Sequence, residues 1–391
     1  RRFFTGPRIS KIIEMALANN RDLRVAALNV ERARAYYRIQ RAELLPRIDA
    51  TGSGYGERVP ADLSSSGESR TVEEYRADIG ITSWEIDFFG RIRSLEKQAL
   101  EEFLATEYAR RSARILLIAE TAGAYLALAA DRENLRLARS TLEAQQASYN
   151  LIRRRFEVGL APKLDLRQVQ QRVDAARVDV ARFTAQTARG ENALNLLVGS
   201  PVPARLLPEG LSSVTPLPEV SPGISSEVLL ERPDILEAES RLRAANANIG
   251  AARAAFFPRI SLTTAVGTAS DDLSGLFQSG SGTWMFAPRV EMPIFDPRIW
   301  AALDVSKADN RIALARYERA IQGAFREVAD ALATQGTVGD QLAAQESLVE
   351  ATTETYQLSN ARYQKGTDTY LSVLDAQRSE EHTSELQSPN T

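Results

Sequence analysis

The chain has 391 residues, 48 basic and 51 acidic side chains, and a formal net charge of −3. A balance this close to neutral argues against nucleic acid as the main partner, because nucleic-acid-binding domains carry a basic patch. With no cysteine and one histidine, His382, the sequence excludes disulfides and thiolate sites and gives no support for a histidine-based triad or metal site. It has no run of 18 or more apolar residues, so we expect no transmembrane helix.

Both ends of the sequence are unusual. The chain starts at Arg1 without Met and without a signal-peptide pattern, so we expect an N-terminal segment to precede it. Residues 379–391 resemble a translated sequencing adaptor, because the run interrupts a helical pattern in mid-course; the alternative is a genuine polar tail. This segment, including His382, is not expected to form part of the fold.

An internal duplication organises the rest of the chain. The motif Leu45-Pro46-Arg47-Ile48 returns as Phe257-Pro258-Arg259-Ile260, and two further motifs recur in the same order at nearly constant spacing. Repeats of this kind indicate two copies of one structural unit. The first repeat covers residues 1–199, the second covers 232–378, and the Pro-rich segment 200–231 is predicted to be an extended connector. By the length of the first repeat, we expect the second to continue past Arg378.

Each repeat is predicted to open with a helix of about 20 to 25 residues and then to change from a period of 3.6 to a period of 2. The alternation predicts strands over about 46–58 and 72–83 in the first repeat and about 258–269 and 284–295 in the second. Each pair is separated by a polar loop, which indicates two β-hairpins.

A half-buried sheet in a soluble protein would show the same alternation. Two features favour a membrane instead. The strands have about ten residues, the length that crosses a bilayer at a tilt. Aromatic residues also gather at both strand ends, as in membrane-interface belts: Tyr75 and Trp284 near the loops, and Trp84, Phe88, Phe89 and Phe295 near the helices.

Long helices follow the strands. We predict helices over about 91–157 and 163–197, a third over about 299–363, and a truncated returning helix from 368. A helix of about 65 residues is ~100 Å long, which is too long for a compact domain. Apolar residues recur every seven positions, which favours supercoiled packing against neighbouring helices. Gly159 and Gly366 mark the turns of two helical hairpins, since glycine tolerates the left-handed conformation that ends a helix.

Four strands cannot close a barrel, and an open edge in lipid would leave backbone groups unpaired at several kcal/mol each. The smallest membrane barrels use about eight strands. The chain is therefore predicted to oligomerise as a dimer, trimer or tetramer, giving a β-pore in a membrane that continues as an α-helical conduit.

Two adjacent stretches of the second repeat are distinctive: Leu229-Leu-Glu-Arg-Pro-Asp-Ile235 and Ile249-Gly-Ala-Ala-Arg-Ala-Ala-Phe-Phe-Pro-Arg-Ile260. With them, the sequence resembles the outer membrane factor family of TolC-type efflux channels, in its NodT/OprM-like outer membrane lipoprotein branch. Glu85-Ile-Asp-Phe-Phe-Gly-Arg91 and Tyr370-Leu-Ser-Val-Leu-Asp-Ala-Gln377 also fit the family pattern. The resemblance covers essentially residues 1–378.

The resemblance implies an α+β membrane protein that forms a homotrimer, with a twelve-stranded β-barrel continued by a twelve-helix α-barrel. It implies a Gram-negative outer membrane location, a long periplasmic extension and an N-terminal lipid anchor upstream of Arg1. Export would be passive, powered by an inner-membrane pump of the resistance-nodulation-division (RND) type through a periplasmic adaptor (membrane fusion protein). No cofactor and no catalytic activity are expected.

The resemblance also implies two sets of functional residues. The hairpin tips that meet the adaptor would be Val158, Gly159 and Leu160 with Lys365, Gly366 and Thr367. The periplasmic gate would consist of Leu371, Asp375 and Arg378. Independently of the family, Leu371 and Asp375 are four apart and share one helical face, and rings of apolar and charged side chains select ions and resist wetting in channels. A solvated surface carboxylate is the simpler interpretation of Asp375.

Other functions remain open at this level. A TolC-like conduit for type I protein secretion or for metal efflux would use the same architecture. A soluble periplasmic coiled-coil scaffold or adaptor would explain the heptads, but not four alternating strands with aromatic ends. An enzyme is the weakest alternative. The sequence has no cysteine, no histidine outside the segment 379–391 and no phosphate-binding glycine motif.

Overall fold

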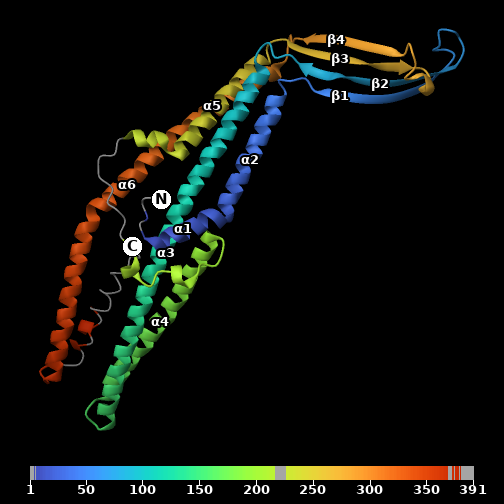
Figure 1. The fold of residues 1–391 in the computed structure, drawn as a ribbon. Coiled ribbons are helices and arrows are strands. Elements are labelled where there is room, and N and C mark those ends of the chain that lie inside the picture. Colours follow the sequence, from blue (N-terminus) through green and yellow to red (C-terminus); the bar gives the residue numbers. More distant parts are fainter. Residues whose placement is uncertain are drawn as a thin grey trace. The chain divides into compact units, whose positions relative to one another are not determined.

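The structure is a computed structural model that describes residues 4, 6–215, 226–368, 372–373, 375–377 and 379. Helices dominate, and the strands of the described part form one sheet (Figure 1). The chain divides into two compact units. Unit 1 contains Arg1–Val25, Arg111–Ser225 and Gly323–Thr391, and unit 2 contains Ala26–Arg110 and Ser226–Gln322.

The sheet belongs to unit 2 and is antiparallel throughout. Its strands are β1 (Ile48–Val59), β2 (Arg70–Glu85), β3 (Arg259–Ser270) and β4 (Gly282–Glu291), in the order β1-β2-β3-β4. The two expected hairpins therefore join through β2 and β3, which come from different repeats. β4 ends at Glu291 and not near residue 295 as expected, because Pro293 has no N–H to give to a strand ladder.

The helices of unit 2 approach one another closely. α2 (Arg21–Ala42) and α5 (Pro233–Ala254) occupy matching places in the two repeats, ahead of β1 and β3. A Cβ added at Gly250 of α5 would lie 2.7 Å from the Oγ of Ser94, near the start of α3 (Arg91–Glu157). Small residues therefore let α5 pack against α3, and the buried ones follow a helical spacing: Ser240, Ala244, Ala247, Ala251 and Ala254.

Unit 1 holds the main hydrophobic core. α1 (Pro7–Asn19) packs with α4 (Lys163–Val198) and with α3, and Ile12, Leu128 and Leu194 are completely buried there. One stretch of α3 is long and apolar enough to cross a membrane, with a mean hydropathy of 1.5, but 39% of it is buried inside the protein. A helix that lines a core passes the same test of hydropathy, so this stretch is weak evidence for a membrane span.

The connector is not simply extended, which corrects the expectation for residues 200–231. It contains three short 3-10 helices, η1 (Ala204–Leu206), η2 (Leu211–Ser213) and η3 (Ser226–Glu231). Leu207 packs into the core of unit 1, and the guanidinium of Arg132 donates to the carbonyl oxygen of Pro208. Proline residues prevented helical periodicity here, but they did not prevent burial.

α6 (Pro297–Gln364) is the last long helix of the described residues, and it is continuous through Gly336 and Gly339, although glycine weakens a helix. Its second half, from Gly323 onward, belongs to unit 1 and leaves many apolar side chains exposed, including Leu332, Leu342 and Leu358. The returning helix expected from residue 368 lies largely outside the described residues, as do residues 380–391 of the adaptor-like tail.

Candidate functional site

The sheet has one apolar face and one polar face across all four strands. The pairing register brings Ile48, Ile81, Thr264 and Phe286 into one row, and Ala50, Ile79, Val266 and Trp284 into the next. Both rows lie on the same face because side chains alternate along a strand with a period of 2. Tyr75, Trp84, Leu262 and Val290 extend this apolar face.

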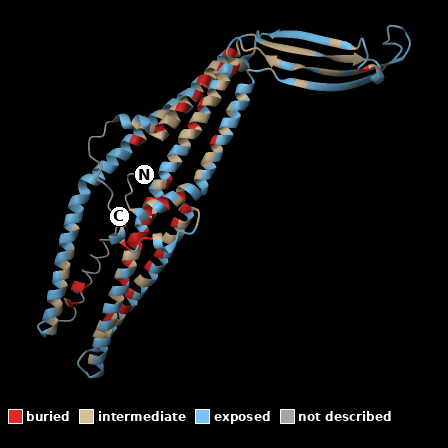
Figure 2. Ribbon diagram, in the orientation of Figure 1, coloured by how far each residue is buried: buried red, intermediate tan, exposed pale blue. Residues whose placement is uncertain are grey.

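Nothing in the described part of the chain covers this apolar face. Figure 2 shows the four strands without a buried residue, whereas buried residues gather in the helices. Phe286 is 61% exposed, Val266 66% and Trp284 78%. A soluble sheet buries such a face against another layer, and an exposed apolar surface of this extent marks contact with a membrane or a partner.

The opposite face is polar and carries ion pairs. Asp49 accepts hydrogen bonds from Arg47 at 2.8 Å and from the hydroxyl of Thr82 at 2.9 Å. Arg76 and Glu74, which point to the same face, form another ion pair. A polar face with ion pairs is stable in contact with water. The two faces of the sheet are therefore expected to contact different environments.

The sheet also has two open edges. β1 pairs only with β2, and β4 pairs only with β3. The outer N–H and C=O groups of β1 and β4 therefore have no strand partner within the described chain. Such edges lead to aggregation in water, and they are not tolerated in the hydrocarbon of a bilayer.

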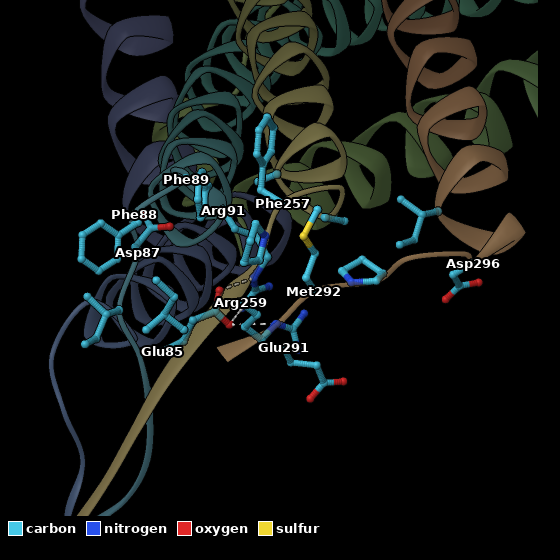
Figure 3. A pocket seen from close by; sticks show the side chains of 17 residues that line it. Glu85, Asp87, Phe88, Phe89, Arg91, Phe257, Arg259, Glu291, Met292 and Asp296 are labelled. Carbon is cyan, nitrogen blue, oxygen red and sulfur yellow. Dashed lines mark hydrogen bonds and ion pairs between the residues drawn. The ribbon is translucent and has the colours of Figure 1, made fainter. Parts of the chain in front are cut away.

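The turns between strands and helices hold a network of charged side chains (Figure 3). Arg91 donates to both carboxylate oxygens of Glu85 at 2.8 Å, and Arg259 reaches the same carboxylate at 3.3 Å. The hydrogen bond from Glu85 raises the pKa of Arg91 above its ordinary value. Since Glu85 ends β2 and Arg259 begins β3, this network ties the two repeats together.

Asp87 caps the start of α3. Its carboxylate accepts hydrogen bonds from the backbone N–H groups of Ile92 and Arg93, at 3.2 and 2.9 Å, and from the side chain of Arg93 at 3.0 Å. Burial acts to raise the pKa of Asp87, but these hydrogen bonds outweigh burial and hold it below the ordinary range. The cap fixes the direction in which α3 leaves the sheet.

The two helical hairpins end in turns of the same geometry. Gly159 and Gly366 both have a left-handed backbone, with φ of 78° and 74°. After each glycine, the next N–H closes the helix end: Leu160 donates to the carbonyl of Arg155 at 2.7 Å, and Thr367 to that of Arg362 at 3.1 Å. This pairing satisfies carbonyls at the end of each helix.

The side chains at the tips are exposed. Val158 is 69% and Leu160 is 70% exposed, and Lys365 and Thr367 are also exposed. A Cβ added at Gly159 or Gly366 would meet no atom within 4 Å. The first tip therefore exposes two apolar side chains, and the second exposes a lysine and a threonine, so both tips are accessible to a partner.

One contact joins the two hairpins beside their tips. The guanidinium of Arg155 donates to the hydroxyl of Tyr363 at 2.6 Å and lies 5.6 Å from the centre of its ring. Both residues belong to unit 1. Arg155 lies four residues before Gly159, and Tyr363 three before Gly366, so the contact links the two hairpins close to their turns.

The predicted gate is described only in part. Leu371 and Arg378 lie outside the described residues. Asp375 is exposed, whereas Val373 is only 4% exposed. Nearby, Asp368 accepts a hydrogen bond from the hydroxyl of Ser372 at 2.8 Å and lies 3.5 Å from Arg362. Within the described part of the chain, no group of three or more His, Cys, Asp or Glu side chains could hold a metal ion.

Comparison with known proteins decides the family. The family model for outer membrane efflux proteins matches residues 12–200 and 224–388. The chain belongs to the outer membrane efflux protein family.

The relatives of this efflux protein are similar over almost its whole length. The toluene efflux pump outer membrane protein TtgF of Pseudomonas putida is 50% identical over 379 residues, which are 96% of this chain and 78% of that protein. The outer membrane protein OprJ of Pseudomonas aeruginosa is 44% identical over 379 residues, 96% of this chain and 79% of OprJ.

Solved structures agree with this assignment. A membrane protein from Pseudomonas aeruginosa has a TM-score of 0.95 and 43% identity, and the match covers 98% of this chain and 90% of that one. The open state of the Neisseria gonorrhoeae MtrE outer membrane channel has a TM-score of 0.88 and 37% identity, and the match covers 98% and 86%.

These findings confirm the expected family, function and location. The protein is an outer membrane channel subunit of a tripartite efflux system. The expected combination of long helices with β-hairpins is present, in a mostly helical protein with a small sheet. The family is one of channels and is not known for enzymes.

Proposed function

We propose that three copies of this efflux protein assemble into a twelve-stranded barrel in the outer membrane, continued by a twelve-helix tunnel in the periplasm. The exposed apolar face of the sheet between two open edges carries this proposal. Lipid would cover the apolar face, water in the pore would wet the polar face, and β4 of one copy would pair with β1 of the next. No backbone edge would then remain in the hydrocarbon.

The assembled tube would export its cargo passively. A periplasmic adaptor would dock on the tips formed by Val158, Gly159 and Leu160 and by Lys365, Gly366 and Thr367, and an RND-type inner-membrane pump would supply the energy. Support comes from the exposed side chains of both tips. Catalysis has no role in this mechanism.

The periplasmic end would be closed by Leu371, Asp375 and Arg378 near the threefold axis. The contact between Arg155 and Tyr363 would hold the second hairpin against the first in the closed state. The solved open state of the MtrE channel supports the idea that a relative can open.

We infer that the cargo consists of small apolar or amphipathic molecules, because a relative at 50% identity is named for toluene efflux. Secretion of polypeptides and efflux of metals have no comparable support. A soluble scaffold is disfavoured because it would leave the apolar face of the sheet in water.

The pairing between copies can be tested by cross-linking, because the chain contains no cysteine. We expect that a panel of variants with one cysteine in β1 (Thr51→Cys or Ser53→Cys) and one in β4 (Thr283→Cys or Met285→Cys) includes pairs that form covalent trimers on oxidation. Each copy would be linked to both neighbours, and denaturing gels would show the trimer.

The matched control places both cysteines within one copy. Gly52 faces Ala77 across β1 and β2, so Gly52→Cys with Ala77→Cys should oxidise and remain a monomer. If the control pair oxidised while every β1/β4 pair gave monomers only, pairing between copies would be wrong.

A further inference from the structure

A pocket of about 320 Å³ lies in unit 2 where the strands meet the helices (Figure 3). Three turns line it: the turn from β2 to α3, the turn from α5 to β3, and the turn from β4 to α6. We call it the junction pocket. One part of its lining is apolar and another part is charged, so the pocket itself is amphipathic.

The apolar part is built on two phenylalanines. The rings of Phe89 and Phe257 are stacked with their centres 4.9 Å apart, and Met292 lines the same pocket. Phe89 is 45% exposed and Phe257 is 51% exposed. A ligand with a hydrocarbon body would therefore cover apolar surface that now faces solvent.

Among the lining residues and their ion-pair partners, arginines outnumber carboxylates by one, although Glu43, outside the lining, also acts on Arg91. Glu85 is a single carboxylate, but it is shared by the guanidinium groups of Arg91 and Arg259. The other carboxylates of the lining form ion pairs with other arginines, although Glu291 also lies directly opposite Arg259 across β3 and β4. Asp87 pairs with Arg93 at 3.0 Å, Glu291 with Arg289 at 3.2 Å, and Asp296 with Arg298 at 2.7 Å.

Of the two arginines that share Glu85, Arg259 is the one positioned to bind an anion. Arg91 occupies both oxygens of Glu85, and its side chain is only 28% exposed. Arg259 reaches Glu85 with Nε alone, at 3.3 Å, and its side chain is 61% exposed. A guanidinium with outward N–H groups forms charge-assisted hydrogen bonds to sulfonate, carboxylate or phosphate oxygens.

We propose that the junction pocket binds an amphipathic monoanion, with its anionic head on Arg259 and its apolar body against Phe89, Phe257 and Met292. The inference rests on the proposed function, because the register places Arg259 on the polar face of the sheet, which the trimer turns toward the pore. Anionic cargo in the pore and an anionic phospholipid share this chemistry, and the polar face favours cargo.

Block of single-channel conductance by two matched probes tests the site. In the full-length protein, hexanesulfonate should reduce the current at lower concentration than hexyltrimethylammonium, which has the same chain and the opposite charge. Arg259→Gln should weaken the block by hexanesulfonate about tenfold, since one charge-assisted hydrogen bond is lost. Arg76→Gln, which neutralises an arginine on the same polar face but outside the pocket, should change it less than about twofold.

Arg259→Lys keeps the charge, so it should retain most of the block, and trimers of each variant on gels show that the protein folds. A second arm measures phosphatidylglycerol retained on trimers by native mass spectrometry. Loss of this lipid in Arg259→Gln but not in Arg76→Gln would support the site with a phospholipid as its ligand.

The proposal is overturned if neither the block nor the retained lipid depends on Arg259 while the wild-type channel conducts. In that case the proposed pore is unaffected, and the junction pocket is a space between the turns that binds no ligand. A wild-type protein that forms no trimer and no channel would overturn both.

Discussion

Replacing Phe286 with arginine should prevent assembly of the outer membrane channel. Phe286 lies on the apolar face of the sheet and is 61% exposed in the single chain. In the proposed barrel this side chain contacts lipid near the middle of β4, where an arginine costs about 2–4 kcal/mol per copy. Three copies would multiply this cost, so heat-resistant trimers in the outer membrane fraction should fall to near zero.

The neighbouring residue provides the control. Ala287 is exposed on the opposite, polar face of the same strand. Ala287→Arg adds the same side chain one position along, but it should point into the water-filled pore and leave trimer yield within about twofold of the wild type. Equal loss in both variants would mean that the two faces of the sheet do not differ in their surroundings.

Replacing Asp375 with alanine should make the full-length channel leak. In the proposed trimer, three Asp375 carboxylates approach the threefold axis at the periplasmic end, where charged and apolar rings narrow the passage. Alanine removes both the charge and part of the bulk, so closed-state conductance in planar bilayers should rise severalfold. The trimer should still form, because Asp375 is exposed in the single chain.

A carboxylate on the long helix α6 provides the control for Asp375→Ala. Glu350 of α6 is exposed and lies away from the predicted gate, so Glu350→Ala should leave the closed-state conductance unchanged. Asp375 would be an ordinary surface carboxylate if its variant conducted no more than Glu350→Ala.

Periodicity predicted the helices and strands of this fold better than it predicted which of them contact one another. The alternation of apolar residues placed strands where β1, β2 and β3 lie, and heptads placed long helices where α3 and α6 lie. Both patterns act over a few residues, so they can be read locally. The early end of β4 follows from Pro293, a local signal that the alternation concealed.

Long-range contacts could not be read in this way. The pairing of β2 with β3, the burial of Leu207 from the connector and the contact of Arg155 with Tyr363 all join residues far apart in sequence. The duplication gave a partial signal for them, since it marked equivalent turns. It could not show that Glu85 of the first repeat would hold Arg259 of the second.

The candidate functional residues also differ in how far the sequence alone could indicate them. Glycines at hairpin turns identify the tips, because Gly159 and Gly366 need a left-handed backbone. The gate depends on family resemblance and on a threefold axis that no single chain contains. The junction pocket requires three turns to meet, so no stretch of sequence could have indicated it.

The number of copies in the membrane-bound complex tests the central claim most directly. Native mass spectrometry of the full-length protein, released intact from outer membranes, should give a complex of three chains and no substantial monomer. One chain offers four strands with two open edges, and twelve strands remove all of them. A water-soluble monomer that does not bind bilayers would contradict the account.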